Sequence, residues 1–322
     1  MINGAGPNGF LGHHVRKVFE NYDHLYNLYN LYCFGKEYDF TNFNDAYAAL
    51  YDTNADILVH MAAMCGGILA NKNSPADFLA QNTLMGINAY EATLKYAKRY
   101  KKNMLVYTLG SVCSYPLNCP VPFKEDDIFS GFPEATNAPY GQAKRTLLML
   151  GQAYREQYGI GGAHLIPVNM YGEYDHFDLT NSHVIPALIN KFATAIKLNR
   201  AAVQCWGNGT ATREFLYAGD CAEAIFKAIN YRIDTPLPIN VGTGEEISIK
   251  DLAYLIKNLT GFQGEIEFTN EVSNGQPRRR LDVTRAQALL GFTATTSLKD
   301  GLKKTIEWYN STRGIRNGTE NN

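Results

Sequence analysis

The sequence predicts an α/β fold in which a Rossmann-like, doubly wound parallel sheet carries a smaller α/β substrate-binding domain. Three observations lead to this prediction. Short apolar runs alternate with longer helical patterns, glycines follow the first apolar run, and the alternation loosens after about residue 175. Strands separated by helices of this length form βαβ units, and the strands of such units lie parallel in one sheet.

The expected elements follow one another in a regular order. The first strand is very short and contains Asn3 and Gly4. Beyond residue 175, "SIKD" (Ser248 to Asp251) predicts a capping box that opens a helix ending near Gly261. Further strands are expected at 28–34, 55–60, 104–109 and 164–168, and long helices at 76–100 and 140–158.

The length of 322 residues is enough for two domains. We expect the Rossmann-like domain to occupy residues 1–178, with returns of the chain near 213–246. The substrate-binding domain is expected over 179–212 and 247–312, followed by a polar, frayed tail over 313–322.

Composition excludes several classes of function. The formal net charge of −1, with interspersed signs, argues against a nucleic-acid binder. No apolar run approaches the roughly 18 to 20 residues that span a bilayer, and the N-terminus lacks a signal-peptide pattern. We therefore expect a soluble, cytoplasmic protein with no membrane partner. The six cysteines show no CxxC pair and no metal-finger spacing, so we expect reduced thiols and no metal site.

The N-terminal stretch "MINGAGPNGFLGHH" places glycines where the first strand would turn into a helix. Two registers fit, Gly4-x-Gly6-x-x-Gly9 and Gly6-x-x-Gly9-x-x-Gly12, and we prefer the second because a helical pattern begins directly after Gly9. At such a turn the backbone can approach a pyrophosphate, and the helix N-terminus can hold its charge. The candidate dinucleotide-binding residues are Gly6, Gly9, Phe10, Leu11 and Gly12.

The strand expected at 28–34 ends in Gly35-Lys36 rather than in an acid. An acid there would hold the ribose 2′-hydroxyl of NAD, whereas a cation suits the 2′-phosphate of NADP. Lys36 therefore favours NADP(H) as the cofactor. The competing interpretation for this residue alone is a solvated surface lysine.

A hydroxyl and a thiol stand two residues apart in "GSVCSYP", directly after the strand expected at 104–109. Side chains at i and i+2 of a strand lie on one face, so Ser111 and Cys113 can point into one site. The structural alternative is a turn serine beside a cysteine that packs as a small buried hydrophobe.

"PYGQAK" places Tyr140 and Lys144 four residues apart, and so on one face of the expected helix. A tyrosine exchanges protons poorly at neutral pH until a nearby ammonium stabilises its phenolate. Lys144 can do this while it binds a cofactor ribose, and Ser111 can hydrogen-bond a carbonyl that is being reduced. Because this spacing is common by chance, its weight comes from following a glycine loop and a serine-bearing strand end.

In these features the chain resembles the extended short-chain dehydrogenase/reductases, and within them the epimerase/reductases of GDP-4-keto-6-deoxymannose. The resemblance runs from the glycine loop to about Trp308. It implies conversion of GDP-4-keto-6-deoxy-D-mannose to GDP-L-fucose by 3,5-epimerisation and NADPH-dependent reduction of the C4 ketone. It also implies a homodimer formed through helices that include the Tyr/Lys helix. The matching stretches are "HMAAMCGGILANKNSPADF", "LGSVCSYP", "ATNAPYGQAK", "NSHVIPALI", "WGNGTATREFLY", "INVGTGEEISI" and "LDVTR".

The resemblance implies a role for each matching residue. Ser111, Tyr140 and Lys144 would reduce the ketone, and Cys113 with His183 would be the acid/base pair of the epimerisation. Arginines would hold the nucleotide sugar, because a guanidinium binds pyrophosphate bidentately. The implied cofactor contacts are Leu109, Ser111, Tyr140, Lys144, Pro167, Asn169, Met170 and His183, and the implied substrate contacts are Lys191, Trp206, Arg213, Asn274 and Arg279.

The sequence departs from the family pattern at four positions. Asn8 stands where some members place an arginine on the 2′-phosphate, and Lys191 replaces a substrate-binding arginine. Asn274 replaces an acid, and Glu173 replaces the usual proline. None of these changes removes a catalytic group.

Two other functions stay open at this point. A 4-epimerase or dehydratase of another nucleotide sugar would need the Tyr/Lys pair but not Cys113 with His183, and a dehydratase would want an acid near Ser111, where Val112 stands. A non-catalytic Rossmann protein that senses its cofactor would not need the intact serine, tyrosine and lysine set.

Overall fold

The core of the protein is a parallel β-sheet. The computed structural model describes residues 2–5, 9–26, 31–34, 37–179, 182–269 and 276–313. Within these ranges the main sheet has six strands in the order β10-β5-β4-β3-β1-β2, and every neighbouring pair is parallel. The strands are β1 (Ile2–Ala5), β2 (Leu31–Phe34), β3 (Ile57–His60), β4 (Leu105–Leu109), β5 (Gly161–Pro167) and β10 (Ile239–Val241).

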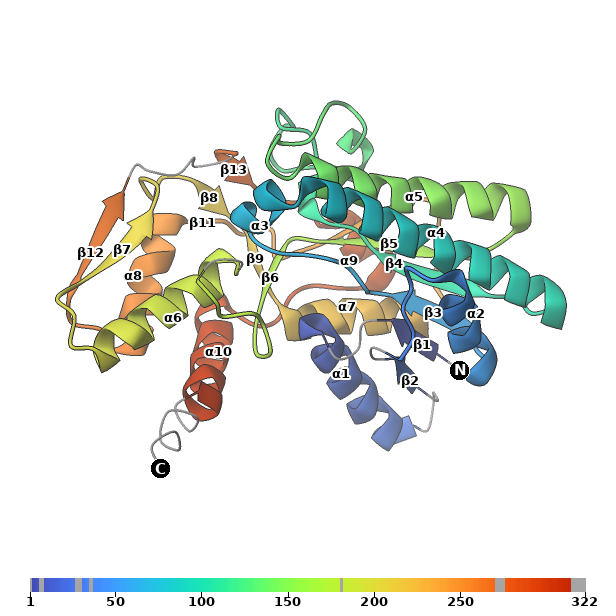
Figure 1. Ribbon diagram of the computed structural model, residues 1–322, viewed down its shortest axis with the longest axis horizontal. Coiled ribbons are helices and arrows are strands. Elements are labelled where there is room, and N and C mark those ends of the chain that lie inside the picture. The colour runs from blue at the N-terminus through green and yellow to red at the C-terminus, as the bar shows by residue number, and fades with distance from the viewer. Residues whose placement is uncertain are drawn as a thin grey trace.

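Helices cover both faces of this sheet, with α4 and α5 above it and α1 and α7 below it in Figure 1. Leu58 and Val106 point toward α2, α4 and α5, whereas Val59 and Tyr107, their neighbours along the strands, pack with α1 and α7. This alternation is the period-2 pattern of a strand buried on both sides. The doubly wound prediction is confirmed. The helices are α1 (Phe10–Tyr26), α2 (Phe43–Asp52), α3 (Ile68–Asn73), α4 (Pro75–Tyr100), α5 (Ala138–Tyr158) and α7 (Ala218–Asn230).

The two long helices begin and end close to their expected bounds. Each carries a proline in its first turn, where no backbone donor is lost. α5 ends at Gly159, whose φ of 70° is a left-handed conformation that glycine adopts without strain. Since these signals are local in the sequence, both helices could be predicted without knowledge of the fold.

A smaller lobe lies at the left of Figure 1 and has its own core. Buried apolar side chains of α6 (Val184–Lys197), α8 (Ile249–Thr260) and α10 (Leu298–Arg313) meet there beside the parallel pair β7 (Ala202–Trp206) and β12 (Glu265–Thr269). The expected capping box is present, because the Ser248 hydroxyl accepts the Asp251 N–H at 3.0 Å.

The chain crosses between the lobes several times. β6 (Asn169–Tyr171) pairs with β9 (Phe215–Tyr217), and β8 (Thr212–Arg213) joins β11 (Ile247–Ser248) and β13 (Arg278–Arg279) in a small sheet. α9 (Thr284–Leu290) falls in a range that we expected in the substrate-binding domain. Its Ala286 and Leu290 instead pack in the core of the main sheet, together with α7 and β10.

Within the described ranges, no helix is long and apolar enough to cross a membrane. The same residues contain no cluster of three or more side chains arranged to hold a metal ion. Of the expected tail, Arg313 is the last residue of α10, and residues 314–322 lie outside the described part of the chain.

Candidate active site

The residues of "GSVCSYP" form a tight turn at the carboxyl end of β4. The strand ends at Leu109, and Val112–Ser114 form a 3₁₀ turn, η1. Ser111 caps this turn, because its hydroxyl accepts the Cys113 N–H at 3.2 Å. The argument that Ser111 and Cys113 share one face of a strand is therefore wrong, since the strand stops before both. The turn nevertheless brings both side chains to Tyr140.

The first turn of α5 packs directly on η1. A Cβ at Gly141 would collide with the carbonyl oxygen of Cys113, so only glycine allows this approach. Buried Arg145 fastens the two segments, since its Nε donates to Ser114 O at 2.6 Å and its Nη2 donates to Gly131 O at 2.8 Å. These contacts place the Tyr140 phenol beside Ser111 and Cys113.

Tyr140 and Lys144 lie on successive turns of α5, as the spacing predicted. The Lys144 Nζ is 5.6 Å from the centre of the Tyr140 ring, and Phe78 meets the ring edge-on at 6.1 Å. Burial holds the pKa of Tyr140 well above its usual value, Cys65 and Cys113 raise it further, and the hydrogen bond with Ser111 opposes the rise. Without cofactor, Tyr140 is therefore a protonated acid at neutral pH.

Lys144 is buried near two histidines, His60 and His164, that were not predicted from the sequence as site residues. Burial lowers its pKa to about 8, and the Cys65 thiol opposes the shift. His60, at the end of β3, and His164, on β5, are held neutral, because burial and then the charge of Lys144 lower their pKa values to about 3. Thr108 fixes the His164 ring through a 2.8 Å contact between Oγ1 and Nδ1. In the sequence both histidines lie in apolar strands, so they would ordinarily be interpreted as core residues.

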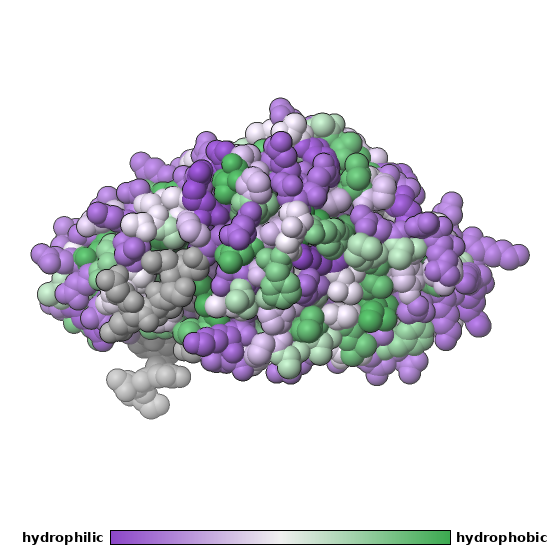
Figure 2. All heavy atoms as spheres, turned by 90° about the horizontal axis from the view of Figure 1, so that it is seen from above, coloured by the Kyte–Doolittle hydropathy of each residue, from purple (hydrophilic) through white to green (hydrophobic). Residues whose placement is uncertain are grey.

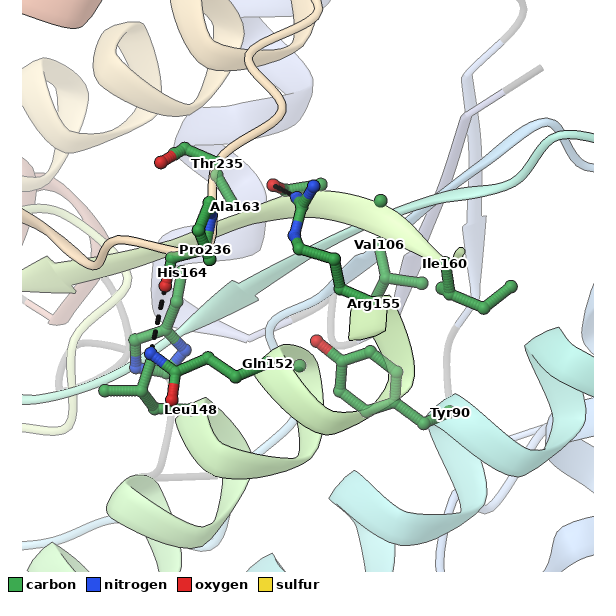
Figure 3. Close-up of a pocket in the computed structure, with 13 residues that line it drawn as sticks. Tyr90, Val106, Leu148, Gln152, Arg155, Ile160, Ala163, His164, Thr235 and Pro236 are labelled. Carbon is green, nitrogen blue, oxygen red and sulfur yellow. Dashed lines mark hydrogen bonds between the residues drawn. The ribbon is translucent and has the colours of Figure 1, made fainter. Parts of the chain in front are cut away.

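A small pocket lies behind this group, between β5 and the helices α4 and α5. Figure 3 shows Tyr90, Arg155 and His164 facing it, with Gln152 donating to Pro236 O at 3.0 Å. His164 is common to the pocket and to the surroundings of Lys144. The pocket lining includes none of the residues that the sequence analysis assigned to the site.

The thiol of Cys113 meets a residue from the end of the chain. Arg279, on β13, places its Nη1 3.8 Å from the Cys113 Sγ, and its Nε donates to Gln276 Oε1 at 3.0 Å. Arg213, its neighbour across the small sheet, donates to the carbonyl oxygen of Thr212 at 2.7 Å. Burial and then Arg279 lower the pKa of Arg213 to about 10, against the opposing effects of Cys113 and Glu134. The expected arginines thus lie at the turn that carries Ser111 and Cys113.

Other expected substrate residues lie farther out in the small lobe. Trp206 is 47% exposed at the end of β7, and the Lys191 Nζ lies 4.8 Å from its ring centre. The same ammonium donates to Gln204 O at 2.8 Å. An exposed indole beside a cation is a suitable surface for a flat base. Asn274 lies outside the described residues.

His183 occupies the N-cap position of α6. Burial and then the neighbouring His176 lower its pKa below the usual value. In the described part of the chain it makes no hydrogen bond to Cys113 or Tyr140. Its pairing with Cys113 therefore stays a prediction.

The expected cofactor residues gather at the carboxyl edge of the main sheet. α1 starts directly after Gly9, so Phe10, Leu11 and Gly12 form its first turn. Gly6, Asn8 and Lys36 lie outside the described residues. Leu109 and Pro167 end β4 and β5, and Asn169 and Met170 begin β6.

The strand order reverses between β1 and β3, and open α/β sheets bind ligands in the crevice at such a point. α1 begins at this edge, where its first N–H groups suit a pyrophosphate. The buried cation of Lys144 suits a ribose at the end of β4. The described residues therefore fit a dinucleotide cofactor.

The model of the NAD dependent epimerase/dehydratase family matches residues 5–242. The chain belongs to this family. The match runs from Ala5, the last residue of β1, to the end of β10 and so includes the turn at Ser111 and the Tyr140 helix.

Relatives cover most of the chain. A probable GDP-L-fucose synthase 1 of Oryza sativa subsp. japonica is 38% identical over 85% of this chain and 81% of its own length. A GDP-L-fucose synthase of Sinorhizobium fredii is 40% identical over 78% of each protein. Among solved structures, a GDP-mannoheptose C4 reductase of Campylobacter jejuni with NADP bound has a TM-score of 0.81 and 26% identity, covering 96% of this chain and 97% of that one.

Proposed function

We propose that the protein converts GDP-4-keto-6-deoxy-D-mannose to GDP-L-fucose by epimerisation at C3 and C5 and NADPH-dependent reduction at C4. One observation carries this proposal. The contact of Gly141 with the Cys113 carbonyl places a thiol suited to proton removal beside the Ser111 and Tyr140 pair suited to ketone reduction. The GDP-L-fucose synthases of rice and Sinorhizobium fredii, which match most of the chain, support the same activity.

For the reduction, the site supplies a proton and positions the ketone. Bound NADPH supplies the hydride. Ser111 holds the C4 oxygen by a hydrogen bond, and Tyr140, protonated because of burial, donates its phenolic proton to that oxygen. Lys144, one turn along α5, stabilises the phenolate left behind and binds the nicotinamide ribose.

For the epimerisation, the hydrogens at C3 and C5 are acidified because both carbons lie next to the C4 carbonyl. Cys113 removes a proton from one face, the resulting enolate is stabilised by Ser111 and Tyr140, and His183 returns a proton to the opposite face. Because burial lowers the pKa of His183, the ring must first take up a proton from solvent, and the resulting imidazolium then gives a proton to the carbon.

The nucleotide sugar is proposed to lie across the two lobes. Arg213 and Arg279 at the catalytic turn would face the diphosphate, and Trp206 with Lys191 would hold the guanine in the small lobe. Asn274 is proposed as a further contact. Lys36 would bind the 2′-phosphate of NADPH, and the NADP-bound reductase of Campylobacter jejuni supports this coenzyme.

We also propose a homodimer formed through α4 and α5. Figure 2 shows hydrophobic areas on the face of the molecule that carries these helices in Figure 1. The exposed apolar side chains there are Leu79, Leu84, Ile87 and Tyr100 of α4 and Met149 and Tyr158 of α5. Cytoplasmic location stays a prediction from the sequence.

A second candidate is a C4 reductase that performs no epimerisation. The Campylobacter jejuni C4 reductase, which matches almost the whole chain, favours it. Such an enzyme would use Ser111, Tyr140 and Lys144, and Cys113 would take no part in its reaction. The two candidates therefore differ in the configuration of their products.

Incubation with GDP-4-keto-6-deoxy-D-mannose and NADPH, followed by product identification, tests the proposal. GDP-L-fucose is the expected product, formed with one NADPH oxidised per molecule. A GDP-6-deoxyhexose that keeps its C3 and C5 configuration would support the reductase instead. Absence of turnover would remove both candidates.

A further inference from the structure

Arg279 reaches the catalytic thiol from the far end of the chain. Its Nη1 lies 3.8 Å from the Cys113 Sγ, although 166 positions separate the two residues. The side chain is 7% exposed. Arg279 is expected to bind the diphosphate, and that role does not require a contact with sulfur.

The guanidinium is held in this place from two sides. Its backbone belongs to β13, where the Arg279 carbonyl accepts the Glu214 N–H at 3.1 Å. Its Nε donates to Gln276 Oε1 at 3.0 Å, and the amide nitrogen of Gln276 donates to Leu117 O at 2.7 Å and Pro116 O at 3.3 Å. Gln276, itself 4% exposed, therefore ties Arg279 to the segment that carries Cys113.

We propose that Arg279 is the positioning residue that keeps the Cys113 sulfur as a thiolate, ready to take a proton from a carbon beside the ketone. Gln276 keeps the Arg279 guanidinium in position by accepting a hydrogen bond from its Nε. The proposal rests on the proposed function and adds to it the group that activates the thiol.

The surrounding charges agree with this role. A guanidinium stays positive at physiological pH, and a cation beside a cysteine favours the thiolate, which is the basic form. Arg213 is a second cation near the same sulfur, and Glu134 acts on Arg213. Tyr140, which also interacts with the sulfur, is neutral. Of these described groups, the two that carry charge beside Cys113 are therefore cations.

The proton transfer balances without a further reactant. The C–H electron pair at C3 or C5 moves into the enolate of the C4 carbonyl, and the proton forms an S–H bond with Cys113. The enolate collapses as its carbon takes a proton from His183 on the opposite face. Cys113 then loses its proton to solvent while His183 takes one up from solvent, and Arg279 again faces a thiolate.

Alkylation of the cofactor-free protein by iodoacetamide tests the thiolate directly. Mass spectrometry follows the Cys113 peptide, because the exposed Cys65 can react with iodoacetamide as well as the half-buried Cys113. At neutral pH, Arg279→Gln should slow Cys113 alkylation at least tenfold, and Arg279→Lys should recover most of the rate because it keeps the cation. Arg278→Gln is the matched control, since Arg278 is half exposed and pairs with Glu246 away from the sulfur.

Alkylation of Arg279→Gln at the parent's rate would overturn the proposal. If that variant does not fold, as judged by thermal unfolding, Gln276→Leu takes its place. It releases the Arg279 Nε and should slow Cys113 alkylation at least threefold, and an unchanged rate would equally overturn the proposal.

Turnover in D₂O separates thiol activation from diphosphate binding. In Arg279→Gln, entry of deuterium at C3 and C5 should fall at least tenfold even at saturating GDP-sugar, in addition to any rise in KM from a lost diphosphate contact. A rise in KM with unchanged exchange at saturation would restrict Arg279 to the diphosphate and contradict the proposal. If the parent itself shows no exchange, the proposed function fails, while the alkylation result still decides whether Arg279 sustains the thiolate.

Discussion

The Lys144 ammonium lies 5.6 Å from the centre of the Tyr140 ring, one helical turn along α5. In the cofactor-free site this lysine does not make the phenol a stronger acid, because burial keeps the pKa of Tyr140 well above its usual value. Burial moves Lys144 in the opposite direction, to a pKa of about 8. In the proposed reaction, Tyr140 would deliver its proton to the ketone, and the Lys144 cation would then face a newly formed phenolate.

Tyr140→Phe should leave cofactor affinity nearly unchanged, because the ring still packs against Phe78. Reduction should fall by roughly 100- to 10,000-fold, which is the usual contribution of general acid catalysis. NADPH oxidation and coenzyme titration measure the two effects separately. Equal reduction rates for variant and parent would remove Tyr140 from the proton-donor role.

Lys144→Met should stabilise the cofactor-free protein at pH 7. The lysine is charged in both the folded and unfolded states below about pH 8, so burial of the charge opposes folding there. The shift from 10.5 to about 8 corresponds to about 3 kcal/mol. Between these two pKa values only the unfolded chain keeps the proton on this lysine. The parent's free energy of unfolding therefore rises with pH, and its difference from that of the variant becomes smaller.

Urea unfolding of Lys144→Met and parent at pH 7 and at pH 10 measures this difference in the free energy of unfolding. The variant should be about 3 kcal/mol more stable at pH 7 and only about 1 kcal/mol more stable at pH 10, while its reductase activity is lost. A variant less stable than the parent at pH 7 would show that burial of the Lys144 charge does not destabilise the folded protein.

Gly141→Ala should impair both half-reactions. The added methyl group meets the Cys113 carbonyl oxygen, so either α5 or η1 must move and the Ser111, Cys113 and Tyr140 group is spread apart. We expect at least a tenfold loss in ketone reduction and in C–H exchange, with a stability loss of about 1–3 kcal/mol from overpacking. Parent-like values of both rates would show that the close approach does not position the site.

Much of the fold could be predicted because its signals are local. A few adjacent residues determine where α4, α5 and α8 begin and end. The strands are recognisable as apolar runs. The same reasoning placed Ser111 with Cys113 and Tyr140 with Lys144. It gave the wrong geometry for the first pair, because a strand pattern does not reveal that β4 stops at Leu109.

The remaining features depend on contacts between distant parts of the chain. The approach of Arg279 to Cys113 joins two lobes, and no spacing in the sequence encodes it. His60 and His164 surround Lys144 only because β3 and β5 flank β4 in the sheet. The packing of α9 with the main sheet likewise follows from tertiary contacts with α7 and β10.

For the coenzyme, we expect a moderate preference for NADPH that depends on Lys36. A single ion pair at a partly exposed site contributes on the order of 1 kcal/mol, so roughly tenfold discrimination is the most that Lys36 can provide. Values of kcat/KM for both coenzymes in the parent and in Lys36→Ala measure it. A parent that prefers NADH would show that Asn8 outweighs Lys36.

The positions of solvent deuterium in the product test the central claim, that one site both epimerises and reduces. The parent protein is given GDP-4-keto-6-deoxy-D-mannose and NADPH in D₂O, and the product is examined by NMR. The account predicts GDP-L-fucose with deuterium at both C3 and C5, and Cys113→Ser should lose this exchange more than it loses hydride transfer. A reduced product that carries hydrogen at C3 and C5 would contradict the account. It would indicate a reductase that does not epimerise its substrate.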